Sequence, residues 1–113
     1  MGYRVLALAA LGLVAVLALP SQALAQVERG AKIFADSKCS LCHAVAGKGN
    51  AKGVLDEVGS KLTVAEIREW LVHPDVMREK AKADRKPLMK SFSTLSKDDL
   101  DALVGYLQTL KKK

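Results

Sequence analysis

The stretch Cys39-Ser40-Leu41-Cys42-His43 says more about this chain than any other part of its sequence. Its two cysteines are the only ones among 113 residues, and two residues separate them. Thiols so close along the chain cannot cross-link distant parts of a fold. The histidine that follows directly adds an imidazole, which can bind a metal. The cluster therefore indicates local chemistry rather than a structural cross-link.

The C-x-x-C-H spacing of this stretch is typical of covalent haem attachment. Two thiols at this spacing can add to the two vinyl groups along one side of a porphyrin. The next residue then carries its imidazole under the ring, toward the iron. Cys39 and Cys42 are thus the predicted thioether links to one haem c, and His43 is a predicted axial ligand of its iron. Such a haem would also supply apolar core to a short chain.

Two other site types use similar residues. A thioredoxin-like redox pair also has C-x-x-C, but it needs a βαβ context, which this sequence lacks. A zinc site could recruit Cys39, Cys42, His43 and His73, although structural zinc sites usually show two ligand pairs at motif spacing. Haem attachment fits the motif better than either.

The N-terminal residues predict export. Arg4 precedes the uncharged apolar run Val5–Leu19, and Ala23-Leu24-Ala25 matches the small-x-small pattern at which signal peptidase cuts. The run has 15 residues, fewer than the roughly 20 of a membrane-spanning helix, so cleavage after Ala25 is expected and an uncleaved membrane anchor is the alternative. We therefore predict a signal peptide over residues 1–25 and one periplasmic domain over residues 26–113.

The fold class is predicted to be all-α, because the periodicity of the mature part is helical and alternating β-branched runs are few. Thr63 and Glu66 form a capping box, and Ser96 precedes two acidic residues that suit a helix N-terminus. The expected elements are a helix over 27–37, a glycine-rich loop over 47–59, a helix over 63–72, a charged and solvated stretch over 75–86 with one or two helical turns, an extended loop over 87–94, and a last helix from 96 to about 110.

The sixth iron ligand must come from far along the chain. Met77, Met89 and His73 are the only mature-chain methionines and the only other histidine. Met89 is preferred, because it lies in an irregular loop that can present a thioether end-on, whereas Met77 lies in the charged stretch. The alternative role for Met89 is to fill space in the core. The alternative role for His73 is to make an ordinary hydrogen bond.

The net charge is +6 for the whole chain and +5 without residues 1–25. That balance favours acidic partner surfaces. Nucleic acid fits poorly as a partner, because aromatic residues are few and no nucleic-acid motif is present. Lys38, Lys48, Lys52 and Lys90 are candidate docking residues near the haem edge.

With these motifs the mature chain resembles a class I cytochrome c, the small soluble monohaem type. The resemblance rests on Gly30-x-x-x-Phe34, the haem motif, Met89-x-x-Phe92-x-x-Leu95-Ser96, and Asp99 through Leu103 with Tyr106 and Leu107. It implies a cytochrome c-like fold in which the N- and C-terminal helices cross around one haem, with Gly30 allowing close approach and Phe34 near Tyr106. It also implies His43 and Met89 as the axial pair.

Three positions of this chain bear on its resemblance to that family. Gly53-Val54-Leu55 replaces a Gly-Pro-x-Leu-like stretch whose proline carbonyl accepts the histidine N–H, so Val54 is expected to offer that carbonyl. Lys90 stands where a proline often follows the methionine. Trp70 matches a tryptophan that contacts a haem propionate in some relatives, but its helical spacing predicts a core position.

The resemblance implies one-electron transfer rather than enzymatic catalysis. The partners would be an oxidase, a reductase or a dehydrogenase of a respiratory chain, and the machinery that attaches c-type haem. A haem enzyme or gas sensor is the alternative, and it would require an open sixth position on the iron.

Overall fold

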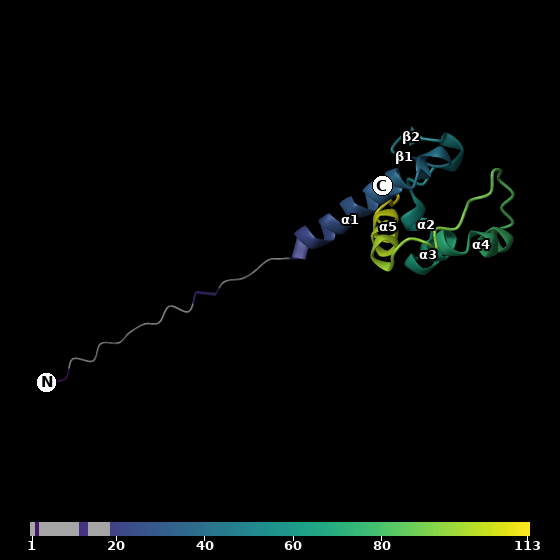
Figure 1. Ribbon diagram of the computed structural model, residues 1–113. Helices are drawn as coiled ribbons and strands as arrows, with labels where there is room; N and C mark the ends of the chain where they lie inside the picture. The colour runs from purple at the N-terminus through teal and green to yellow at the C-terminus, as the bar shows by residue number, and fades with distance from the viewer. Residues whose placement is uncertain (1, 3–11, 14–18) are drawn as a thin grey trace.

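The computed structural model describes residues 2, 12–13 and 19–113. The described chain is mainly helical, as predicted, and Figure 1 shows its elements. In order they are α1 (Leu19–Asp36), η1 (Cys39–Leu41), β1 (Ala44–Val45), β2 (Lys48–Gly49), η2 (Ala51–Gly53), α2 (Val58–Lys61), α3 (Val64–Val72), α4 (Pro74–Ala81) and α5 (Lys97–Gln108).

In the described part of the chain, an all-α fold is interrupted by a short hairpin that begins at Ala44, ahead of the predicted glycine-rich loop over 47–59. Strands β1 and β2 pair antiparallel, with Val45 opposite Lys48. The two residues between them, Ala46 and Gly47, have φ values of 52° and 79°. Positive φ at both central residues is the geometry of the tight turns that suit two-residue hairpins. Ala46 is not a residue that signals such a turn, so the sequence did not predict it.

Helices α1 and α5 cross in close contact (Figure 1), and small residues allow the approach. A Cβ atom on Gly30 would overlap the carbonyl oxygen of Ala102 and the Cβ atom of Tyr106. One turn further along α1, the ring of Phe34 meets that of Tyr106 edge to face, with centroids 5.7 Å apart. Both contacts confirm the arrangement expected from the sequence.

The core lies where α3 packs against this crossing. Its buried members come from α1, α3 and α5: Phe34, Ile67, Leu71, Leu103, Val104 and Leu107. Arg68 of α3 also reaches Asp101 of α5, with Nη2 2.6 Å from Oδ1. The core is small, as expected of a short domain.

The helix ends follow the predicted signals. Thr63 and Glu66 make both bonds of the capping box, and α3 ends at Val72. Ser96 accepts a hydrogen bond from the backbone N–H of Asp99 at the start of α5. The charged stretch does contain two helical turns, as α4. The prediction that Leu110 belongs to the last helix is wrong, because α5 ends at Gln108 and Leu110 packs on the core from the following segment.

Most of the predicted signal peptide lies outside the described residues. Helix α1 begins at Leu19 and runs on through Ala25, the predicted cleavage point. Residues 21–26 are exposed, and Figure 1 shows this end of α1 projecting away from the other helices. Among the residues that the structure describes, no helix is both long enough and apolar enough to cross a membrane.

Candidate cofactor site

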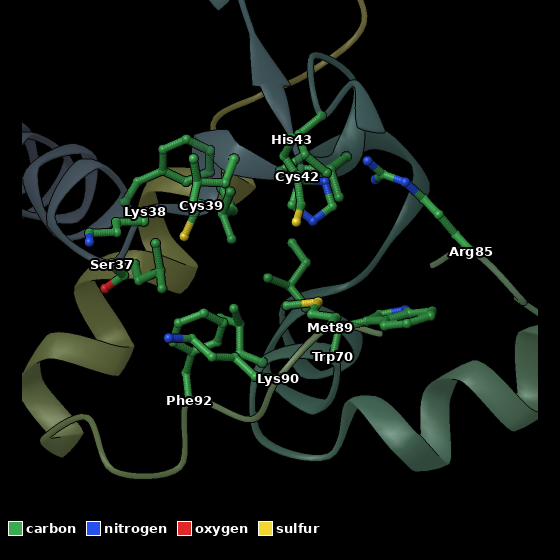
Figure 2. Close-up of a pocket in the computed structure, with 18 of the residues that line it drawn as sticks. Ser37, Lys38, Cys39, Cys42, His43, Trp70, Arg85, Met89, Lys90 and Phe92 are labelled. Carbon is green, nitrogen blue, oxygen red and sulfur yellow. The ribbon is translucent and has the colours of Figure 1, made fainter. Parts of the chain in front are cut away.

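A cavity of about 550 Å³ opens beside the core (Figure 2). This volume lies within the roughly 300–1,000 Å³ of typical ligand and cofactor sites. Its walls come from all five α-helices, from η1, and from loop segments that include the one after α4. They are largely apolar, and they include the core residues Phe34, Ile67, Leu71, Leu103 and Leu107.

The haem motif forms one wall of this cavity. Lys38 has a left-handed backbone, with φ of 58°, which ends α1 and turns the chain into η1. The carbonyl oxygen of Cys39 then accepts bonds from the N–H groups of Cys42, at 3.2 Å, and His43, at 2.9 Å. This tight turn places both half-buried thiols and the imidazole along the cavity.

Met89 lies across the cavity from His43, and Figure 2 shows the two side chains pointing toward each other from opposite sides. Met89 is half-buried and also packs against the core. The loop thus brings a thioether to the face opposite the imidazole. The structure therefore brings the two predicted iron ligands to one cavity.

The imidazole of His43 is oriented by a backbone carbonyl. Its Nδ1 atom lies 3.0 Å from the carbonyl oxygen of Gly53. Since a carbonyl only accepts, Nδ1 carries the hydrogen and Nε2 keeps its lone pair. The expectation that Val54 would supply this carbonyl is wrong by one residue. A Cβ atom on Gly53 would overlap the Cys42 carbonyl oxygen and the Arg85 guanidinium, so the close approach requires glycine.

The protonation states of the motif fit metal binding better than thiol redox chemistry. Burial lowers the pKa of His43 below 6.5, against the opposing effect of the Gly53 bond, so the ring is neutral near pH 7. Burial raises the pKa of Cys39 to about 11. A thioredoxin-like nucleophile needs a lowered thiol pKa. The redox-pair alternative therefore has no support here.

The other candidate ligands lie away from the cavity. His73 is exposed, and its Nδ1 atom lies 3.0 Å from Oε2 of Glu69. Met77 is half-buried but does not line the cavity. Within the described part of the chain, no group of three or more histidine, cysteine and acidic side chains could hold a metal ion. The four-ligand zinc site is therefore not assembled.

Four basic side chains line the cavity, and the sequence predicted two of them. Lys38 and Lys90 are there as expected, whereas Lys48 and Lys52 do not line it. Arg78 and Arg85 were missed because they fall in a stretch predicted to be solvated. One signal was available for Arg78: it follows the buried Pro74 by four residues, and so shares its face of α4.

Trp70 is not in the core, contrary to its predicted place. It is half-buried and lines the cavity, on the same side as Arg85 in Figure 2. The helical spacing correctly placed Trp70 on the inner side of α3. It could not reveal that this side faces a cavity as well as the core.

These residues fit a covalently attached haem. Two thiols and a neutral imidazole with a free lone pair share one wall, a thioether faces them, and apolar side chains enclose the space between. Cys39 and Cys42 would hold the porphyrin, and His43 and Met89 could bind its iron from the two sides.

Comparison with known proteins supports the same conclusion. The sequence model of the family described as cytochrome c matches residues 27–111. A similar curated protein is a cytochrome c oxidase subunit 2 from Alkalihalophilus pseudofirmus, which is 27% identical over 101 residues. That match covers 81% of this chain but only 27% of the relative, so the chain spans about a quarter of its length. No solved structure gives a significant match.

Proposed function

The chain belongs to the cytochrome c family, as a class I c-type cytochrome, and on that premise we propose that it is a periplasmic carrier of single electrons with one covalently bound haem. The observation that carries this proposal is the cavity in which His43 and Met89 face each other beside two free thiols. An electron carrier needs no substrate site beyond such a pocket.

Each residue of the pocket has a distinct proposed role. Cys39 and Cys42 form thioether bonds, which keep the cofactor from being lost after export. His43 would hold the iron through Nε2, while the Gly53 carbonyl fixes the tautomer and orientation of the ring. Met89 would hold the iron from the side opposite His43, so that no coordination position would remain for a substrate or gas.

When bound, the haem supplies an iron that takes up and releases one electron. The chain sets how readily this happens. A methionine ligand would raise the reduction potential of the haem iron. The apolar walls do the same, because they penalise the extra charge of the ferric form.

Export and partners complete the proposal. Residues 1–25 are a signal peptide cleaved after Ala25, and residues 26–113 are the cytochrome domain. The exposure of residues 21–25 supports this division, because their removal would uncover no core. A membrane anchor is the alternative if they are retained. Basic residues at the cavity, among them Lys38 and Lys90, favour redox partners with acidic surfaces.

Among partners, an oxidase is favoured over a dehydrogenase, because the similar protein described above is a subunit of a cytochrome c oxidase. A reductase would be the donor on the other side of the carrier. The haem-attachment machinery is a partner during maturation, since the two thioether bonds must be formed after export.

Visible spectroscopy of the protein exported together with that machinery tests the proposal. The wild type should be coloured and reversibly reducible. Its ferric form should show the weak iron–methionine charge-transfer band, and its ferrous form should bind carbon monoxide slowly. Met89→Ala should lose the band and bind carbon monoxide readily, whereas Met77→Ala should behave as the wild type.

Each alternative has its own outcome in this experiment. Rapid carbon monoxide binding by the wild type would indicate an open position, as in a haem enzyme or sensor. A band that survives in Met89→Ala would assign the sixth position to another residue. A colourless protein would contradict the proposal altogether.

A further inference from the structure

The loop that carries Met89 packs on the core but is held by few hydrogen bonds. No helix or strand occurs between Ala81 and Lys97. Toward its end the loop is tied to α3, where the backbone N–H of Phe92 donates to the Leu71 carbonyl at 2.7 Å and the Ser91 hydroxyl to the Val72 carbonyl at 2.7 Å. In the part of the chain that the structure describes, one hydrogen bond reaches residues 84–90, and its acceptor is the carbonyl oxygen of Met89.

The donor of that bond is Arg78. Its Nη1 atom lies 3.1 Å from the Met89 oxygen. The backbone carbonyl of Arg78 also accepts the N–H of Ala83, at 2.9 Å, where the loop begins. One residue of α4 therefore holds both the start of the loop and its methionine.

The burial of Arg78 strengthens this contact. Its side chain is half-buried and lines the same cavity as Met89. A hydrogen bond from a charged donor is stronger than one between neutral groups, and partial exclusion of water strengthens it further. The planar guanidinium also has a more fixed geometry than a lysine ammonium.

The sequence explains why such a contact is needed. A proline after the methionine would fix the backbone φ at that position, and Lys90 leaves it free. Lys90 is exposed, and its ammonium lies 5.3 Å from the ring centroid of Phe92, so it restrains a side chain and not the Met89 backbone.

We propose that Arg78 is the positioning residue of Met89: its guanidinium holds the Met89 carbonyl and so keeps the thioether directed into the cavity, toward His43. The inference rests on the proposed function, in which Met89 binds the iron. Arg78 itself touches neither the iron nor any reacting atom in this account.

The test compares two variants of Arg78. Arg78→Met keeps a side chain of similar bulk but has no hydrogen-bond donor, whereas Arg78→Lys keeps the positive charge but not the planar guanidinium. Arg68→Met is the matched control, because Arg68 is also half-exposed but binds Asp101, away from the loop. The readouts are the ferric iron–methionine band and the rate of carbon monoxide binding to the ferrous holoprotein. A role in overall stability alone would not move either readout in the folded protein.

Arg78→Met should bind carbon monoxide about tenfold faster or more, the factor expected for loss of one charge-assisted hydrogen bond, and its band should weaken. Arg78→Lys should show an intermediate change, and Arg68→Met none. If Arg78→Met yields no folded holoprotein, the change in Arg78→Lys decides alone. Wild-type rates and a full band in the folded Arg78 variants would overturn the proposal.

Met89→Ala, measured alongside, separates this inference from the function on which it rests. If Met89→Ala changes both readouts and the Arg78 variants change neither, the methionine ligand stands and the role of Arg78 is wrong. If Met89→Ala leaves both readouts unchanged, the proposed ligation is wrong, and the role of Arg78 falls with it.

Discussion

The Nδ1 atom of His43 lies 3.0 Å from the carbonyl oxygen of Gly53, a residue that has no room for a side chain. The hairpin β1–β2 lies between the two residues along the chain, and the short helix η2, which ends at Gly53, returns the chain to the motif. The geometry of the proposed iron ligand thus depends on a glycine ten residues away in sequence.

Replacing Gly53 with alanine should disturb His43 directly. The new methyl group would overlap the Cys42 carbonyl and the Arg85 guanidinium and would crowd the imidazole. We expect a loss of about 1–3 kcal/mol in the free energy of unfolding, the usual cost of overpacking, together with an altered haem spectrum. Denaturant unfolding of the holoprotein and its ferric spectrum would measure both effects.

Val54→Ala is the control for that experiment. The side chain of Val54 is 57% exposed, so its truncation should change stability by no more than about 0.5 kcal/mol. If Gly53→Ala and Val54→Ala had the same free energy of unfolding and the same ferric spectrum, the role assigned to Gly53 would be wrong.

Gly30→Ala should loosen the crossing of α1 and α5. Its methyl group would meet the Ala102 carbonyl and the Cβ atom of Tyr106, so the helices must separate. We expect destabilisation of about 1–3 kcal/mol by denaturant unfolding. Gly105→Ala is the matched control, since no atom lies within 4 Å of the added position, and alanine should stabilise α5 by about 0.5–1 kcal/mol. If Gly30→Ala left the free energy of unfolding unchanged, the crossing of α1 and α5 would tolerate a wider spacing.

Asp101 should stabilise the folded protein at neutral pH, and this stabilisation should be lost in acid. Hydrogen bonds from Lys97 and then Arg68 hold the pKa of Asp101 below 3.8 in the folded chain. A lowered folded pKa stabilises the protein above the unfolded value, and this contribution is lost as the pH falls through the folded value. Asp101→Asn should therefore be less stable than the wild type at pH 7, and the difference should shrink below pH 3.8.

Urea titrations of both proteins at several pH values would measure that difference. Asp84→Asn is the control, because Asp84 is exposed and the structure records no ion pair for it in the described chain. A difference that stays constant from pH 7 into acid would mean that the Asp101 carboxylate does not act through its charge.

The sequence predicted those parts of the fold that short-range rules control. The capping box at Thr63 and the cap at Ser96 were both found, because such caps need only residues three positions apart. The end of α5 was missed by two residues. Leu110 keeps the apolar period of the helix. Its carbonyl accepts the N–H of Gly59 at 2.7 Å, a tertiary contact that the sequence pattern does not show.

The site was predictable where chemistry depends on spacing, and not where it depends on tertiary contacts. The Cys39, Cys42 and His43 cluster follows from its motif, and the structure brings Met89 to the same cavity. The acceptor for His43 was placed at Val54 because register in an irregular loop cannot be read from sequence. Arg78 was missed because its stretch was predicted to be solvated, and its bond to the Met89 carbonyl does not follow from the side-chain pattern.

The most direct test of the central claim is the mass of the mature protein after export with the haem-attachment machinery. Intact and peptide mass spectrometry under denaturing conditions should find one haem bound through two thioethers to the peptide that contains Cys39 and Cys42, and a mature N-terminus at Gln26. Cys39→Ser should retain at most one such bond. A wild-type protein at its haem-free mass, with free or disulfide-bonded cysteines, would contradict the account.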